Sequence, residues 1–266
     1  MKQLSYALIL AGMFSGSGLV VAAETSPHTV TGNLNFVTDY RFRGISQTFE
    51  DPAIQGGFDY AHSSGFYLGT WASNVEEAEL SGSNMEWDVY GGYTFNVGSV
   101  AVNVGGLYYW YPGKDERYYD FDGDGVGDSG FDPNTFEVYV GATWKWLNVK
   151  YSHTTTKLFG ISDSEGSGYL EANATFALPM DITLGLHVAK QFVAGDIAPG
   201  VANDDYMDWK IGITKPILGF NVGLAYVDTD IEANNVTWGY NTAFAKGSQT
   251  KNLTDGTVVL SIGKTF

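Results

Sequence analysis

The feature that most constrains the fold of this chain is a repeated unit in which apolar residues alternate with polar or small ones. From Val30 to Phe266, segments of about ten residues carry this period of two, and each segment ends at a turn or a loop. Helical periodicity appears nowhere convincingly. We predict twelve strands, at residues 30–44, 54–62, 66–75, 84–95, 99–112, 135–145, 147–158, 167–177, 182–193, 206–215, 219–231 and 256–266.

The connections between these strands alternate between short and long. Short turns lie at 62–65, 96–98, 145–146, 178–181 and 216–219, and long loops cover 45–53, 76–83, 113–134, 159–166, 194–205 and 232–255. Barrels of the bacterial outer membrane alternate short periplasmic turns with longer extracellular loops, whereas a soluble β-sandwich has no reason to do so. We therefore predict an all-β fold, a transmembrane antiparallel β-barrel of about 12 strands with both termini in the periplasm.

One face of the predicted strands is apolar. It is aliphatic in mid-strand, as at Val102, Leu184 and Leu260, and we assign it to lipid. Aromatic residues on this face gather near the strand ends, which predicts two girdles at the membrane interfaces. We expect Phe95, Trp144, Phe176, Phe220 and Phe266 at the short-turn end, and Tyr40, Phe42, Trp87, Tyr108, Trp110, Phe136, Trp209 and Tyr226 at the long-loop end.

The opposite face is polar and rich in small residues. Unpaired charges in a dry core cost several kcal/mol each, whereas charges that face a wet lumen cost little. We predict a pore lined by Asp39, Arg41, Arg43, Asp59, Glu86, Asp88, Glu137, Lys150, Glu171, Asp208 and Lys210. Carboxylates outnumber cations in this set, so a mild preference for cations is expected. Inward glycines favour an open lumen, namely Gly105, Gly141, Gly185, Gly223 and Gly263.

The charges at the start of the barrel admit two interpretations. Asp39, Arg41 and Arg43 belong to the first predicted strand and face carboxylates of the second and fourth, at Asp59, Glu86 and Asp88. In one interpretation they set a transverse field that acts on ions or polar solutes. In the other they form cross-strand ion pairs that fill a narrow barrel and hold its register.

The first residues predict an exported protein. Lys2 precedes an apolar run that ends at Val21-Ala22-Ala23, the pattern of a secretory signal peptide cleaved after Ala23. The run is short and broken by glycines and serines, whereas a spanning helix needs about 20 mostly apolar residues. We predict a signal peptide at 1–23, a periplasmic lead-in at 24–29 and a transmembrane barrel at 30–266, in an outer membrane of the Gram-negative type.

The last residues also predict an outer-membrane protein. Phe266 closes an alternating strand, and a terminal aromatic residue of this kind resembles the signal that hands outer-membrane proteins to the barrel assembly machinery. Lys264 departs from the apolar residue usual near the end, although its ammonium can reach the lipid headgroups. We expect outer-membrane lipids and the assembly machinery as partners.

Charge and cysteine content exclude other classes. The formal net charge is −16, and removal of Lys2 with the signal leaves 13 basic residues against 30 acidic ones. Nucleic acid is not expected as a partner, because phosphate binding needs clustered Lys and Arg. The chain has no cysteine, so no disulfide framework supports it.

Three early segments carry a family resemblance. They are Thr38–Thr48, Asp51–Tyr60 and Ser64–Val75, and together they resemble the TorF family of porins. The match in motifs covers about the first three predicted strands, and the later chain matches in pattern and length. The resemblance implies an outer-membrane barrel with a pore, and it supplies neither a substrate nor binding residues.

One long loop contains a candidate metal site. Acidic residues stand at relative positions 1, 3, 5 and 9 of a calcium-loop pattern, with a glycine at position 6 and a main-chain carbonyl at position 7. Phe131 occupies position 12, where the pattern has a bidentate Glu. The alternative is an acidic, glycine-rich, solvated loop. The candidate ligands are Asp120, Asp122, Asp124, Val126 and Asp128.

An enzyme is disfavoured by the positions of the candidate residues. Barrels of this size include an outer-membrane phospholipase with a Ser, His and Asn site, and Ser152 stands beside His153 here. Strand alternation points these two side chains to opposite faces, so they cannot act as nucleophile and base.

Two functions remain. The first is passive diffusion of small hydrophilic solutes or ions through a narrow lumen, with no required cofactor. The second is a structural or adhesion barrel whose acidic extracellular loops bind calcium and whose lumen is closed. A lumen blocked by inserted loops would favour the second.

Overall fold

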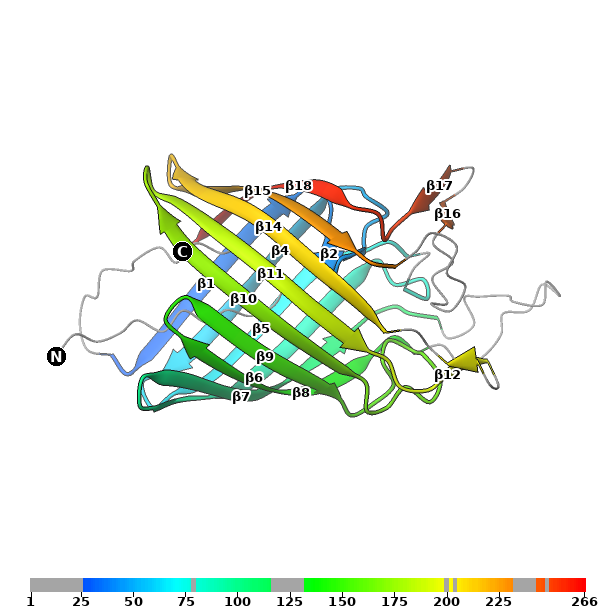
Figure 1. Ribbon diagram of the computed structural model, residues 1–266, viewed down its shortest axis with the longest axis horizontal. Coiled ribbons are helices and arrows are strands. Elements are labelled where there is room, and N and C mark those ends of the chain that lie inside the picture. The colour runs from blue at the N-terminus through cyan, green and yellow to red at the C-terminus, as the bar shows by residue number, and fades with distance from the viewer. Residues whose placement is uncertain are drawn as a thin grey trace.

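The computed structural model describes residues 26–77, 80–115, 132–198, 201–202, 205–231, 243–246 and 249–266. Twelve strands close into one antiparallel barrel, which confirms the predicted fold class (Figure 1). The wall strands are β1 (His28–Val37), β4 (Ala53–His62), β5 (Phe66–Asn74), β6 (Met85–Val97), β7 (Val100–Trp110), β8 (Thr135–Trp144), β9 (Leu147–Thr154), β10 (Gly168–Leu178), β11 (Ile182–Phe192), β14 (Tyr206–Ile217), β15 (Phe220–Thr229) and β18 (Thr257–Thr265).

Short strands outside the wall form three small two-stranded sheets. They are β2 (Arg41–Phe42) with β3 (Ile45–Ser46), β12 (Asp196–Ala198) with β13 (Val201–Ala202), and β16 (Ala243–Lys246) with β17 (Gln249–Asn252). None of the described residues belongs to a helix long and apolar enough to cross a bilayer.

The first and last wall strands close the barrel. β1 pairs with β18 from Asn33 opposite Thr265 to Val37 opposite Ser261. Gly32 and Phe266 extend this ladder by two reciprocal main-chain hydrogen bonds of 2.8 and 2.9 Å. Every wall strand therefore has two neighbours, which satisfies the backbone groups that hydrocarbon cannot solvate. The C terminus lies at the end of the barrel that carries the short turns (Figure 1).

The outer surface has the apolar character predicted for a lipid-facing wall. Aliphatic side chains such as Leu34, Ile213 and Leu260 are exposed there. Trp87 and Trp110 are cross-strand partners on this face near the long connections, with ring centroids 6.0 Å apart. These rings stand where an interfacial girdle is expected.

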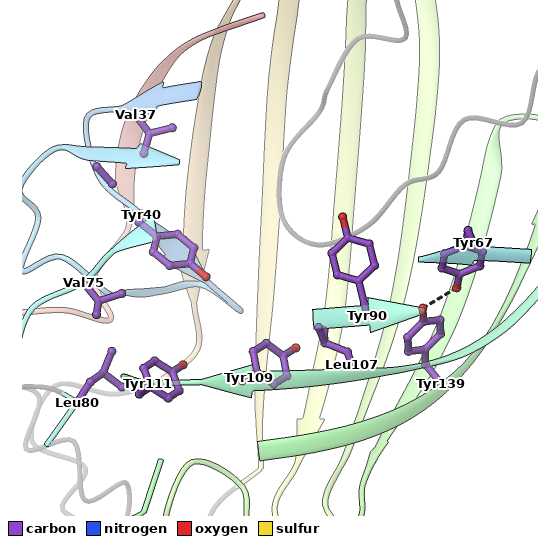
Figure 2. Close-up of a cluster of buried hydrophobic side chains, with 11 residues drawn as sticks. Val37, Tyr40, Tyr67, Val75, Leu80, Tyr90, Leu107, Tyr109, Tyr111 and Tyr139 are labelled. Atoms are coloured by element: carbon purple, nitrogen blue, oxygen red, sulfur yellow. Dashed lines mark hydrogen bonds between the residues drawn. The ribbon is translucent and has the colours of Figure 1, made fainter. Parts of the chain in front are cut away.

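On the inner face of β5 to β8, tyrosines cover glycines of neighbouring strands. A Cβ atom at Gly69 would overlap the ring of Tyr90, and one at Gly105 would meet the hydroxyl of Tyr139 at 2.5 Å. Gly92 lies under Tyr67 in the same way. Gly105 therefore makes room for the ring of Tyr139, and the inference that it opens the lumen is wrong. Figure 2 shows Tyr67 and Tyr139 with their hydroxyls facing each other.

The predicted first strand is wrong in its second half. β1 ends at Val37, where Val37 pairs with Ala53 of β4, and the chain then enters the barrel. Tyr40 is buried and Phe42 half-buried inside the lumen, so neither belongs to the outer girdle. A tilted strand spans a membrane with about 9–11 residues, and β1 has already reached that length at Val37.

Candidate functional site: a chain segment folded into the lumen

Residues 38–50, called the inner segment below, form a hairpin inside the barrel. β2 pairs with β3 through Phe42 opposite Ile45, and the turn between them is Arg43-Gly44 with φ angles of 47° and 85°. Two successive positive φ angles are typical of a two-residue hairpin turn. A side chain at Gly44 would overlap Thr229 of β15 and crowd Asp208 of β14, so glycine lets this turn approach the far wall.

Asp39 organises the hairpin from within. Its carboxylate accepts hydrogen bonds from Nε of Arg41, from the hydroxyl of Ser46 at 2.7 Å and from the hydroxyl of Thr48 at 3.3 Å. All four side chains are buried. Charge-assisted hydrogen bonds of this kind fix local geometry strongly, so the inner segment has one defined shape.

Arg43 anchors the hairpin to the far wall. One terminal nitrogen donates to both carboxylate oxygens of Glu137 on β8 at 2.7 and 2.8 Å, and the other donates to Gln191 of β11 at 2.7 Å. The guanidinium also lies 4.2 Å from the ring centre of Tyr169 on β10. Burial disfavours the charged guanidinium, but Glu137 outweighs this effect, so the pKa of Arg43 lies above its ordinary value.

Tyr40 anchors the opposite side of the hairpin. Its hydroxyl donates to Glu86 of β6 at 3.1 and 3.3 Å from the two carboxylate oxygens, and its ring meets Trp71 of β5 edge-on at 5.4 Å. Burial, and then the negative charge of Glu86, raise the pKa of Tyr40 well above its ordinary value, so the phenol stays neutral. Figure 2 shows Tyr40 among the buried apolar residues, near Val37 and Val75.

A third set of contacts joins the inner segment to the chain just before β18. Arg41 donates to the carbonyl oxygens of Leu253 at 2.8 Å and Asp255 at 3.1 Å. The amide of Ser46 donates to Leu253, and Nζ of Lys251 donates to the carbonyl of Phe49 at 2.8 Å. The inner segment is thus fixed to the barrel on three sides and crosses the lumen.

The inner wall of β9 to β14 carries a continuous polar network. Lys150 pairs with Glu171 at 2.6 Å, and Asn173 links Glu171 to Nδ1 of His187. Nε2 of His187 lies 2.9 Å from Asp208, whose other oxygen accepts from Tyr169 at 2.8 Å. Because Tyr169 stacks on Arg43, the network reaches the inner segment.

The inner wall of β4 to β8 is acidic. Asp59 accepts a hydrogen bond of 2.6 Å from Tyr90, and Glu86 accepts from Tyr40. Asp88 is buried, and its Oδ1 has no hydrogen-bond partner among the residues that the structure describes. Between the inner segment and the loop at 158–161 lies a cavity of about 30 Å³, room for only a few water molecules.

Strand alternation placed most of the predicted pore-lining residues on the inner face. Those on the wall are Asp59, Glu86, Asp88, Glu137, Lys150, Glu171, Asp208 and Lys210. Asp39, Arg41 and Arg43 were expected on the first wall strand, and that expectation is wrong, because they belong to the inner segment. Their ion pairs also differ from the expected ones, since Asp39 binds Arg41 and Arg43 binds Glu137. That any of these residues lines a conducting pore stays a prediction.

Sequence reasoning missed the residues that receive the hairpin. Tyr169 and Gln191 were not singled out, and Tyr40 was assigned to the outer surface. Gly44 has a positive φ angle at the turn of the hairpin, but a single glycine at the end of an alternating run does not indicate that the wall strand ends at Val37.

Two other predicted sites have different outcomes. The calcium-loop ligands Asp120, Asp122, Asp124, Val126 and Asp128 lie outside the described residues. Within the described residues, no group of three or more His, Asp or Glu side chains is arranged to hold a metal ion. Ser152 is buried inside the barrel, whereas the ring of His153 lies beside that of Tyr151 on the outer face.

Solved structures of porins have the same barrel architecture. The KdgM porin superposes with a TM-score of 0.50 at 8% sequence identity, over 89% of this chain and 98% of that chain. KdgM in complex with disordered oligogalacturonate gives 0.49 at 8% identity, over 90% and 99% of the two chains. The NanC porin gives 0.49 at 10% identity, over 88% and 98%. At 8% identity the likeness to the KdgM porin shows the fold alone, a closed β-barrel.

Comparison of the sequence itself gives a family. No curated protein is significantly similar to this chain. A family model described as "Bacterial protein of unknown function (Gcw_chp)" matches residues 21–266. Since the match spans the entire barrel, the chain belongs to the Gcw_chp family.

Proposed function

We propose that the protein is a narrow outer-membrane channel for passive diffusion of small hydrophilic solutes or ions. The observation that carries the proposal is a closed barrel with an apolar outer face and a charged inner face, crossed by a folded chain segment. Charges such as Lys150 and Glu171 are only partly buried, as expected for groups that line a wet lumen. The motif resemblance to the TorF porins and the porin-like fold support the same conclusion. We propose no catalytic role.

Cation preference is part of the proposal. Acidic residues outnumber basic ones among the predicted pore-lining residues of the wall, and Arg41 and Arg43 of the inner segment are each paired with an acid. The acidic ones are Asp59, Glu86, Asp88, Glu137, Glu171 and Asp208, and the basic ones are Lys150 and Lys210. A wall with excess negative charge raises the local concentration of cations and repels anions. Small cations should therefore pass more readily than anions of the same size.

A closed structural or adhesion barrel is the second candidate. The observation in its favour is the inner segment itself, because its anchors on three sides leave little free space beside Phe42 and Arg43. In this case the acidic loop at 113–134 would bind calcium or an outside partner, and solutes would not pass.

Conductance in planar bilayers separates the two candidates. The test compares the natural chain with a variant in which residues 38–52 are replaced by the dipeptide Asn-Gly. Because Val37 and Ala53 are direct cross-strand partners, a two-residue turn can join them and keep the pairing of β1 with β4. The replacement removes the two hydrogen bonds between Thr38 and Leu260 of β18. The control carries the same dipeptide in place of Ser63-Ser64, a short turn outside the lumen.

We expect a small, cation-selective conductance for the natural chain and the control, and a much larger one for the variant. If the natural chain and the shortened variant are both electrically silent over a range of voltage and salt, the channel proposal is wrong. If only the shortened variant conducts, the inner segment closes the lumen of the natural chain, as the second candidate requires.

A further inference from the structure

Two carboxylates of β6 face the inner segment from one strand face. Glu86 is 1% exposed and Asp88 is 3% exposed, and their separation of two residues directs both side chains inward. Tyr40 donates to both oxygens of Glu86. Oδ1 of Asp88 is buried and unpartnered among the described residues, which is unusual for a carboxylate and requires an explanation.

The surrounding elements bring almost no positive charge to this pair. β8 contributes Glu137, whose charge is already balanced by Arg43 at 2.7 Å. Arg41 of the inner segment is held by Asp39 and by main-chain carbonyls. The other side chains near the pair in the described part of the barrel are neutral, and they are Trp71 and Ser73 on β5, Tyr90 on β6, Tyr109 on β7, Tyr111 after it, and Tyr40.

Two ionised carboxylates cannot remain dry in this position. They lie about 7 Å apart along the strand, and their repulsion is strong in a medium of low polarity. A buried charge without a partner either takes up a proton or becomes hydrated. Tyr40 is a hydrogen-bond donor to Glu86, so water that replaces this donor displaces Tyr40 and with it the inner segment.

We propose that Glu86 and Asp88 form a proton-binding site, and that a proton bound there holds the inner segment in the lumen. Loss of the proton in alkaline solution makes both carboxylates negative. Water then enters, the Tyr40 anchor loosens and the lumen widens. The link to conductance rests on the proposed channel function, whereas the movement of the segment does not.

The absence of cysteine makes the movement measurable with single engineered thiols. Gln47→Cys places a thiol in the buried inner segment, at a side chain that, within the described ranges, donates to the carbonyls of Ile45 and Ser46 alone. Thr175→Cys places one at an exposed inner-wall position of β10 as the reference. The readout is the ratio of their labelling rates with a water-soluble maleimide, which cancels the pH dependence of the thiol itself.

We expect this ratio to rise between pH 6 and pH 9, by up to about tenfold per pH unit for a one-proton linkage. Asp88→Asn keeps the shape and removes one charge, so the rise should disappear. Asp59→Asn is the matched control, because this inner-wall carboxylate has a donor in Tyr90 and the rise should persist. Heat-modifiable electrophoretic mobility confirms that each variant is folded, and Glu86→Gln replaces Asp88→Asn if the latter does not fold.

A ratio that is flat in the natural background, or a rise that persists in the charge-neutralised variant, overturns the proposal. The outcome is independent of the channel test. If the labelling ratio depends on pH but the barrel never conducts, the proton-binding site is supported and the channel function is wrong. If the barrel conducts but the labelling ratio does not change with pH, the channel function is supported and the proton-binding site is wrong.

Discussion

The ion pair between Arg43 and Glu137 should stabilise the folded barrel through the inner segment. Their side chains are 6% and 2% exposed, and the distances to the two oxygens of Glu137 are 2.7 and 2.8 Å. Arg43→Met leaves the carboxylate of Glu137 buried, and its remaining donors among the residues with described positions are the hydroxyls of Tyr109 at 3.3 Å and Thr154 at 3.5 Å. Removing one partner of a buried pair costs about 3–5 kcal/mol.

The double variant separates the pair from its surroundings. Glu137→Gln alone should also cost about 3–5 kcal/mol, because it leaves Arg43 without its acid. Arg43→Met with Glu137→Gln leaves no charge of this pair buried, so it should be within about 1–2 kcal/mol of the natural chain, which corresponds to a coupling energy of about 4 kcal/mol or more. The measurement is equilibrium unfolding by guanidinium in lipid vesicles, followed by tryptophan fluorescence. The matched control is Lys150→Met with Glu171→Gln, a pair that is 19% and 14% exposed.

The control pair should couple less strongly than the buried pair, because its side chains are partly solvated. If the Arg43 and Glu137 substitutions are simply additive, or couple no more strongly than the control pair, the claim that a buried ion pair fixes the inner segment is incorrect.

Three further results are expected. Gly69→Val should destabilise the barrel by about 1–3 kcal/mol in the same unfolding assay, because its side chain would meet a tyrosine ring, whereas Gly141→Ala, with its nearest neighbour at 3.5 Å, should be nearly neutral. Leu224→Arg on the lipid face should cost about 2–4 kcal/mol, and Thr175→Arg on the inner face should cost much less; equal costs would contradict the assignment of faces. The acidic loop at 120–128 should bind calcium weakly, with a dissociation constant of about 10⁻⁴–10⁻³ M by calorimetry, and no heat above dilution would show a solvated loop instead.

The wall of the barrel could be predicted from the sequence because it is a single layer of strands in which successive side chains alternate between the two faces. Each wall residue faces either lipid or lumen, so alternation alone placed Leu260 outside and Asp208 inside. Barrel closure added the even number of strands and the pairing of the first with the last. Neither inference needed knowledge of long-range contacts.

The inner segment could not be predicted because it has the same alternation as a wall strand. Asp39, Arg41 and Arg43 alternate with Tyr40 and Phe42, and this pattern suits a strand between water and lipid as well as a hairpin between charged and aromatic walls. The choice depends on partners far away in the sequence, such as Glu137. Pairing across a lumen leaves no local periodic signal.

The contacts of Arg41 and Ser46 with Leu253 tie the first turn of the barrel to the residues immediately before its last strand. The hairpin therefore cannot complete its anchorage until the final strand has arrived beside β1. Docking of the hairpin and pairing of β1 with β18 therefore become a single cooperative step in biogenesis. In a nascent barrel that still lacks its last strand, the hairpin would not be anchored. Cleavage of the hairpin by a protease would then show that β1 and β18 have not yet paired.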